Sequence, residues 1–192
     1  MNTPNKLTLS RIFILTPFFL VFALIAHGLK TQGAFVWYGA ILFFIWSGLF
    51  DFLDGNIARS QGSITIFGKQ IDPIADKFTI VVALLVANWI GELPLWVTGV
   101  VVCRDYLVDG IRSIVISQKC EVVSASRLGK AKTFTQFLGL IILFIAASGV
   151  DKLLYPGQWI IYFSVFLAVV SMFDYFSKNW NILLYSLEEK EK

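Results

Sequence analysis

Cysteine and histidine are scarce in this chain, which has two cysteines and one histidine in 192 residues. Cys103 lies in an apolar segment and Cys120 in a polar one, so they indicate neither a disulfide framework nor a metal-binding pair. Because zinc sites are built largely from cysteine and histidine, a zinc centre is not expected. His27, at the end of an apolar run, suits a packing or interfacial position.

Charged residues are also few. They make up 15% of the chain against 57% hydrophobic residues, which excludes an ordinary soluble domain. The apolar runs are long enough to cross a bilayer, so the sequence predicts an all-α integral membrane protein. The first run, residues 12–26, follows Lys6 and Arg11 as the core of a signal peptide would. Further apolar segments come after it, and we therefore expect a retained first helix.

Hydrophobicity predicts six transmembrane helices, preceded by a short interfacial segment at residues 1–11. The predicted spans cover residues 12–28, 34–54, 72–91, 94–117, 133–149 and 157–176. The chain shows no internal repeat, low-complexity tract or long linker. We expect a single membrane domain over residues 1–192.

The loop cations indicate how the helices are oriented. With a cytoplasmic N-terminus, the outer loops contain only Lys30 and Lys152. The inner side then holds eight cations, Lys6, Arg11, Arg59, Lys69, Lys119, Arg127, Lys130 and Lys132. Because lysine and arginine gather in cytoplasmic loops, both termini are predicted to be cytoplasmic.

Four aspartates stand between two of the apolar segments, near the cytoplasmic ends of the spans. Asp51 and Asp54 are spaced i, i+3, so in a helix they share one face. Asp72 and Asp76, spaced i, i+4, share a face of the next helix. Each would cost roughly 3 kcal/mol at the centre of a bilayer, so the group needs a cation. Hard carboxylate oxygens suit Mg²⁺ or Mn²⁺, and we predict such a site.

A structural alternative is that these aspartates form ion pairs and only end two helices. The candidate partners are Arg59, Lys69 and Lys77. Structural ion pairs can imitate functional sites, and they explain a single aspartate as well as a metal does. They explain less well why four carboxylates gather in one stretch.

Small and polar residues accompany the aspartates. Gly55 leaves room for a ligand to approach the backbone, and Ala58 keeps the same helix face narrow. Arg59 offers a forked phosphate donor. Gly68 would allow close approach where the chain returns to the membrane, and Thr65 adds a hydroxyl.

The whole stretch resembles the signature of the CDP-alcohol phosphotransferase family. The pattern reads Asp51-x2-Asp54-Gly55-x2-Ala58-Arg59-x8-Gly68-x3-Asp72-x3-Asp76, with every signature position filled. The resemblance implies six transmembrane helices, usually a homodimer, and transfer of a phosphoalcohol from a CDP-linked donor to an acceptor hydroxyl with release of CMP.

The resemblance also implies roles for individual residues. The four aspartates would bind two Mg²⁺ or Mn²⁺ ions, and Asp76 would be the general base. The binding site for CDP-diacylglycerol would comprise Asp51, Asp54, Gly55, Ala58, Arg59, Thr65 and Gly68.

Basic residues further along the chain are candidates for binding the acceptor. Arg104 and Arg112 lie about two helical turns apart, and Lys130 and Lys132 precede the fifth span. Together they would suit an anionic acceptor. The alternatives are salt bridges from the arginines to neighbouring aspartates within their own helix, and a purely topological role for the lysines.

Segments 4–11, 72–77, 104–112 and 129–133 resemble the bacterial branch of this family that makes phosphatidylglycerol phosphate. One departure is Asp105, where that branch usually has glutamate. The implied reaction joins CDP-diacylglycerol to sn-glycerol 3-phosphate, in a bacterial plasma membrane among membrane lipids, with the site facing the cytoplasm and no nucleic-acid partner. Inositol phosphate, serine or phosphatidylglycerol are alternative acceptors, and a cation transporter is an alternative of another class.

Overall fold

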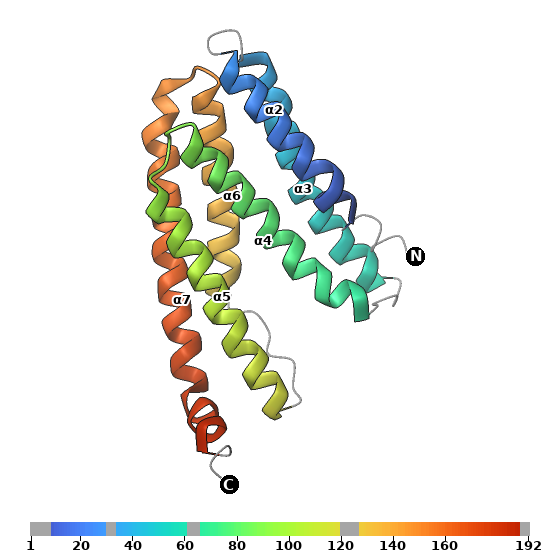
Figure 1. Ribbon diagram of the computed structural model, residues 1–192, viewed down its shortest axis with the longest axis vertical. Helices are drawn as coiled ribbons and strands as arrows, with labels where there is room; N and C mark the ends of the chain where they lie inside the picture. Colours follow the sequence, from blue (N-terminus) through green and yellow to red (C-terminus); the bar gives the residue numbers. More distant parts are fainter. Residues whose placement is uncertain (1–8, 30–33, 61–65, 120–126, 189–192) are drawn as a thin grey trace.

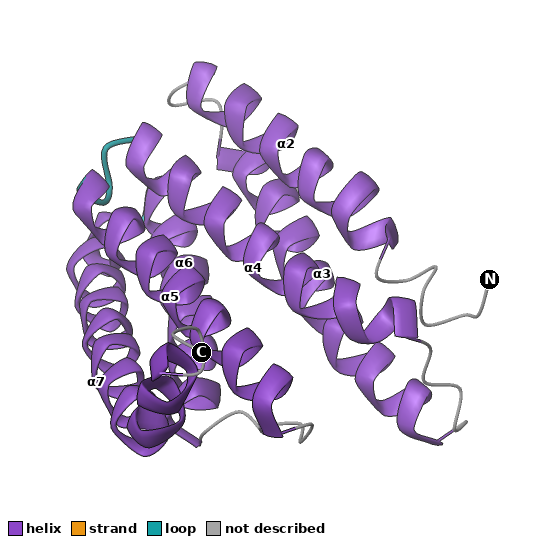
Figure 2. Ribbon diagram, turned by 60° about the horizontal axis from the view of Figure 1, so that its bottom comes forward, coloured by secondary structure: helices purple, strands orange, loops and turns teal. Residues whose placement is uncertain are grey.

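The computed structural model describes residues 9–29, 34–60, 66–119 and 127–188. Within these ranges, the backbone alone is described for residues 11, 34, 50–60, 66–73, 76, 116–119, 127, 128, 130 and 181–188. The described chain is helical, without strands, and Figure 2 draws its helices in purple. This confirms the predicted all-α fold.

Six long helices and two short ones form the described bundle (Figure 1). The long helices are α2 (Thr16–Gly28), α3 (Ala34–Ser60), α4 (Ile66–Trp89), α5 (Leu95–Lys119), α6 (Arg127–Ala147) and α7 (Leu154–Glu188). The short ones are the π-helix η1 (Arg11–Leu15) and the 3₁₀-helix η3 (Asp151–Leu153). Each predicted span overlaps one long helix. Helices α3, α4, α6 and α7 run beyond the predicted spans, because hydrophobicity marks the apolar part of a helix whereas backbone hydrogen bonding continues through polar residues.

The described residues differ in how well they meet the requirements of a membrane span. Asp151–Trp180 is long and apolar enough to cross a membrane by length and composition. Four shorter apolar helical segments are Ile12–Gly28, Phe35–Leu49, Lys77–Trp89 and Ala131–Ala147. The number of spans therefore stays a prediction.

Large apolar side chains lie on the outside of the bundle. Phe35 on α3 is 86% exposed, Tyr106 on α5 76% and Trp159 on α7 71%. Such an outer surface would be costly in water and is favourable in hydrocarbon.

Aromatic side chains join the helices inside the bundle. The ring of Phe19 on α2 lies 5.4 Å from that of Phe44 on α3 and 5.3 Å from that of Phe144 on α6. All three are almost fully buried. Figure 1 shows α2 beside α3, with α4 between this pair and the group of α5, α6 and α7.

Glycines set the close packing of α6 against α7. A Cβ added at Gly139 would lie 2.8 Å from Ile161, and one at Gly157 would lie 2.9 Å from Leu143. These two contacts define an antiparallel register. Continued along both helices toward the other end, the register brings the beginning of α6 level with the segment of α7 near Ala168, where polar contacts gather.

Candidate active site

Buried hydroxyl groups join α2, α3 and α4, and the signature aspartates lie on the last two of these helices. Thr79 Oγ1 on α4 lies 3.1 Å from Thr16 Oγ1 on α2 and 3.3 Å from Ser47 Oγ on α3. Thr79 also donates to the backbone carbonyl of Ala75 at 3.2 Å. These hydroxyls are at most 5% exposed, so they form hydrogen bonds with one another in place of water. The contact between Ser47 and Thr79 thereby fixes α3 against α4.

This contact determines which helix faces meet. Asp51 follows Ser47 by one helical turn on α3, and Asp76 precedes Thr79 by about one turn on α4. The helix positions of the two aspartates are therefore next to those of a pair of residues already in contact. Eight signature positions lie on α3 or α4, and for these residues the structure describes the backbone but not the side chain. They are Asp51, Asp54, Gly55, Ala58, Arg59, Gly68, Asp72 and Asp76. Thr65 lies outside the described residues.

The described side chains contain no group of three or more His, Cys, Asp or Glu residues that could hold a metal ion. The side chains of the four signature aspartates lie outside that description. The donor chemistry still suits a hard divalent cation, because aspartate provides carboxylate oxygens. The predicted metal site remains a prediction.

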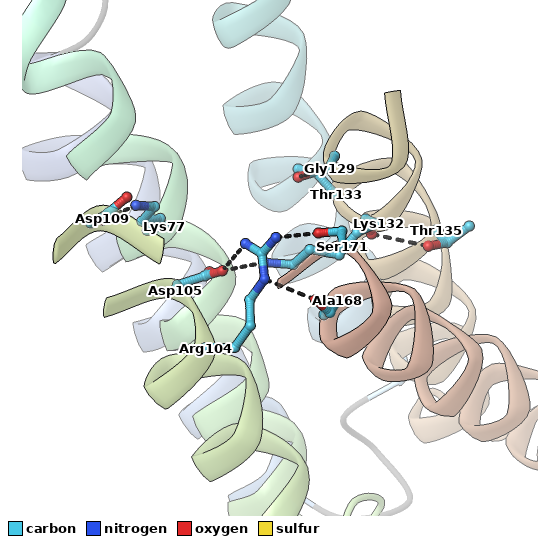
Figure 3. A network of polar contacts seen from close by, with 10 residues as sticks. All are labelled: Lys77, Arg104, Asp105, Asp109, Gly129, Lys132, Thr133, Thr135, Ala168 and Ser171. Carbon is cyan, nitrogen blue, oxygen red and sulfur yellow. Dashed lines mark hydrogen bonds and ion pairs between the residues drawn. The ribbon is translucent and has the colours of Figure 1, made fainter. Parts of the chain in front are cut away.

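Arg104 is the centre of a polar cluster between α5 and α7 (Figure 3). Its Nε donates to the backbone carbonyl of Ala168 at 3.0 Å, and its Nη1 donates to Asp105 Oδ1 at 2.9 Å. Its Nη2 donates to the hydroxyl of Ser171. The Arg104 side chain is only 12% exposed, so these contacts hold a guanidinium away from solvent.

Lys132 brings α6 into the same cluster. Its Nζ donates to Asp105 Oδ1 at 2.6 Å, and its side chain is 6% exposed. One carboxylate oxygen therefore accepts from two cations. Arg104, Asp105 and Lys132 together carry one net positive charge in a largely buried place, an arrangement that suits an anion.

A second ion pair joins α4 to α5. Lys77 Nζ donates to Asp109 Oδ2, with side chains 33% and 43% exposed. Lys77 is one of the candidate ion-pair partners of the four signature aspartates. Its described partner is instead Asp109 on α5. A cleft of about 210 Å³ runs beside the pair, and its lining includes Ile74, Lys77 and Asp105. Ile74 and Lys77 lie within two residues of Asp76 in the chain, and Asp105 belongs to the cationic cluster, so the cleft lies beside part of each.

The structure brings together two of the four predicted acceptor residues, Arg104 and Lys132. Arg112 is half-buried on α5, and its Nε makes no hydrogen bond to any described residue. The side chain of Lys130 lies outside the description. The alternative interpretation, a salt bridge from Arg104 to an aspartate of its own helix, is also realised, with Asp105. Asp109, the other aspartate of that alternative, pairs with Lys77 on α4.

Three polar residues of the site were missed by the sequence reasoning. Ser47 and Thr79 join α3 to α4, and Ser171 binds Arg104 from α7. Each is a hydroxyl among apolar neighbours in its helix, and the local sequence does not show that it has a partner on another helix. Ser47 and Thr79 could have been noticed because each lies about one turn from a signature aspartate.

The α4–α5 connection has a separate cavity, of about 530 Å³. Its lining includes His27, Trp37, Glu92 and Ser148. Partial burial, and secondarily the charge of Asp151, raise the pKa of Glu92 above its ordinary value of 4.5.

Comparison with known proteins assigns this helical bundle to a class. The sequence pattern described as CDP-alcohol phosphatidyltransferase matches residues 1–170. The chain belongs to the CDP-alcohol phosphatidyltransferase family.

Individual relatives are similar over most of their length. The chain is 35% identical to "CDP-diacylglycerol--glycerol-3-phosphate 3-phosphatidyltransferase" of Bacillus subtilis, covering 95% of this chain and 97% of that one. It is 34% identical to a protein of the same name from Rickettsia felis, covering 91% and 93% of the two chains. A "Probable phosphatidylglycerophosphate synthase" of Mycobacterium tuberculosis is 35% identical, with 92% and 81% covered.

Proposed function

We propose that this enzyme transfers the phosphatidyl group of CDP-diacylglycerol to sn-glycerol 3-phosphate, giving phosphatidylglycerol phosphate and CMP. The observation that carries this proposal is the buried cluster of Arg104, Asp105 and Lys132, with its one net positive charge. A phosphate on the acceptor would compensate that charge, whereas serine has no phosphate to bind there. The names of the relatives from Bacillus subtilis and Rickettsia felis support the same donor and acceptor.

The donor half of the site would be built on α3 and α4. Asp51, Asp54, Asp72 and Asp76 would hold the divalent cations, Mg²⁺ or Mn²⁺ and two in number. Bound there, the ions would neutralise charge on the diphosphate. The contact between Ser47 and Thr79 supports this arrangement, because it fixes the two helices against each other about one turn from the aspartates.

The remaining signature residues would bind the CDP-diacylglycerol headgroup. Gly55, Ala58 and Gly68 would leave space for it, while Arg59 and Thr65 would donate hydrogen bonds. The diacyl chains would pass sideways between helices into the lipid. The cytidine diphosphate would then stay at the cytoplasmic interface.

The chemical step would be an in-line displacement. The acceptor hydroxyl attacks the phosphorus that carries the diacylglycerol, a new P–O bond forms, and the P–O bond to CMP breaks. Asp76 would orient the hydroxyl and take up its proton. Arg104 and Lys132 would hold the acceptor phosphate, with Arg112 and Lys130 as further contacts.

We place the enzyme in a bacterial plasma membrane with six spans, both termini in the cytoplasm, and a homodimeric assembly. The charge asymmetry of the loops supports this orientation. The exposed aromatic and aliphatic side chains of α3, α5 and α7 support contact with lipid.

The test is an assay of purified protein with CDP-diacylglycerol, Mg²⁺ or Mn²⁺, and a panel of acceptors. CMP and the lipid product are both measured. We expect CMP release with sn-glycerol 3-phosphate and formation of phosphatidylglycerol phosphate. Release only with inositol phosphate, serine or phosphatidylglycerol would overturn the acceptor assignment, and no release with any acceptor would overturn the whole proposal.

A further inference from the structure

We propose that Ser171 on α7 is a positioning residue, which holds the guanidinium of Arg104 in the orientation that binds the acceptor phosphate. This inference rests on the proposed function. The matched family segment ends at residue 170, so Ser171 lies just beyond it. Nothing in the signature or in the acceptor segments of the sequence pointed to this serine.

The first observation is the way α7 holds Arg104. The helix provides two acceptors, the carbonyl of Ala168 for Nε and the hydroxyl of Ser171 for Nη2, while Asp105 accepts from Nη1. A guanidinium has five N–H donors. The three described contacts leave one N–H on each terminal nitrogen, and these two donors can bind phosphate oxygens.

The second observation is that the described contact of the Ser171 hydroxyl lies on another helix. A serine in an apolar helix usually bonds a carbonyl of its own helix, as Ser164 does with Ile161 at 2.7 Å. The described contact of the Ser171 hydroxyl is to Arg104 instead. Ser171 is 1% exposed, so in the described structure its hydroxyl is directed to a neighbouring helix and away from solvent.

Together these contacts fix a long side chain that would otherwise move among several rotamers. Asp105 holds Arg104 from its own helix, and Ser171 holds it from α7. Fixing the guanidinium before the substrate arrives lowers the conformational entropy that binding must remove. Ser171 would act through Arg104, and its loss should therefore weaken binding of the acceptor more than binding of the lipid donor.

The test compares Ser171→Ala with the matched control Ser164→Ala in steady-state kinetics. Both serines are buried on α7, and both variants lose one hydroxyl. We expect Ser171→Ala to raise the KM for sn-glycerol 3-phosphate about tenfold, as loss of one hydrogen bond to a charged group implies. The KM for CDP-diacylglycerol should change less than twofold. Ser164→Ala should leave both constants near those of the wild type.

Ser171→Thr restores a hydroxyl and should return the KM for glycerol phosphate to within about twofold of the wild type. Ser171→Cys, close in size but a weak acceptor, replaces Ser171→Ala if that variant does not fold. An unchanged KM for glycerol phosphate in whichever variant is used would overturn the inference, and so would an equal rise in both KM values. A wild-type protein that turns over CDP-diacylglycerol only with another acceptor would instead contradict the proposed function, and this inference with it.

Discussion

Lys132 on α6 donates a 2.6 Å hydrogen bond to Asp105 on α5, through the carboxylate oxygen that also accepts from Arg104. Both cations are largely buried, and one carboxylate compensates only one of their two charges. A second anion placed against them would complete the compensation. The predictions on acceptor binding follow from this charge balance.

Lys132→Ala should raise the KM for sn-glycerol 3-phosphate about tenfold or more, because it removes one of the two cations proposed to bind the phosphate. The KM for CDP-diacylglycerol should stay within twofold. The matched control is Lys178→Ala, because Lys178 is a lysine 69% exposed on α7 and paired with Asp174. Steady-state assays with each substrate varied in turn make the comparison. Equal rises in both KM values would contradict an acceptor-specific role.

Asp105→Asn should destabilise the protein, because it leaves two buried cations without their shared carboxylate. Removing one partner from a buried ion pair costs about 3–5 kcal/mol. The control Asp109→Asn breaks the more exposed pair with Lys77 and should cost no more than about 1 kcal/mol. Thermal unfolding in detergent measures the loss of stability in each variant. A larger loss in Asp109→Asn than in Asp105→Asn would contradict this prediction.

The same pair of variants tests the charge balance directly. Added sn-glycerol 3-phosphate should raise the unfolding midpoint of Asp105→Asn more than that of Asp109→Asn, because a bound phosphate would replace the missing negative charge. Equal shifts for the two variants would show that the acceptor binds elsewhere.

The sequence predicted the six helices because each contains a long apolar run, and it predicted a cationic acceptor pocket from Arg104, Arg112, Lys130 and Lys132. It could not show that Arg104 and Lys132 share Asp105. They come from different helices, and the register of α6 and α7 depends on contacts of Gly139 and Gly157 that a linear pattern does not contain. Ser171 was missed for the same reason, since its partner lies on another helix.

Asp76→Asn should abolish CMP release while leaving the unfolding midpoint within a few degrees of the wild type. The substitution keeps the size of the side chain and removes the charge proposed for metal binding and proton uptake. The control is Asp174→Asn on α7, which should keep full activity because Asp174 pairs only with Lys178 in the described structure. CMP release in detergent micelles is the measurement. Substantial turnover by Asp76→Asn would remove the residue from the catalytic role.

Glu92 should make stability depend on pH at the α4–α5 connection. Burial first, and the charge of Asp151 second, raise the pKa of this carboxyl in the folded protein above 4.5. The folded state therefore binds the proton more tightly than the unfolded state does. The resulting stabilisation is complete below about pH 4.5 and is lost as the pH rises through the raised pKa.

Glu92→Gln should abolish this pH dependence and unfold at a higher temperature than the wild type at neutral pH, because the glutamine is never charged. Asp151→Asn should have a smaller effect, since the charge of Asp151 is the lesser cause of the raised pKa. Unfolding midpoints measured between pH 4.5 and 8 distinguish the variants. If Glu92→Gln kept the wild-type slope over that range, the pH dependence would have to come from other groups. If Asp151→Asn had the larger effect, repulsion between the two carboxylates would outweigh burial at this end of the bundle.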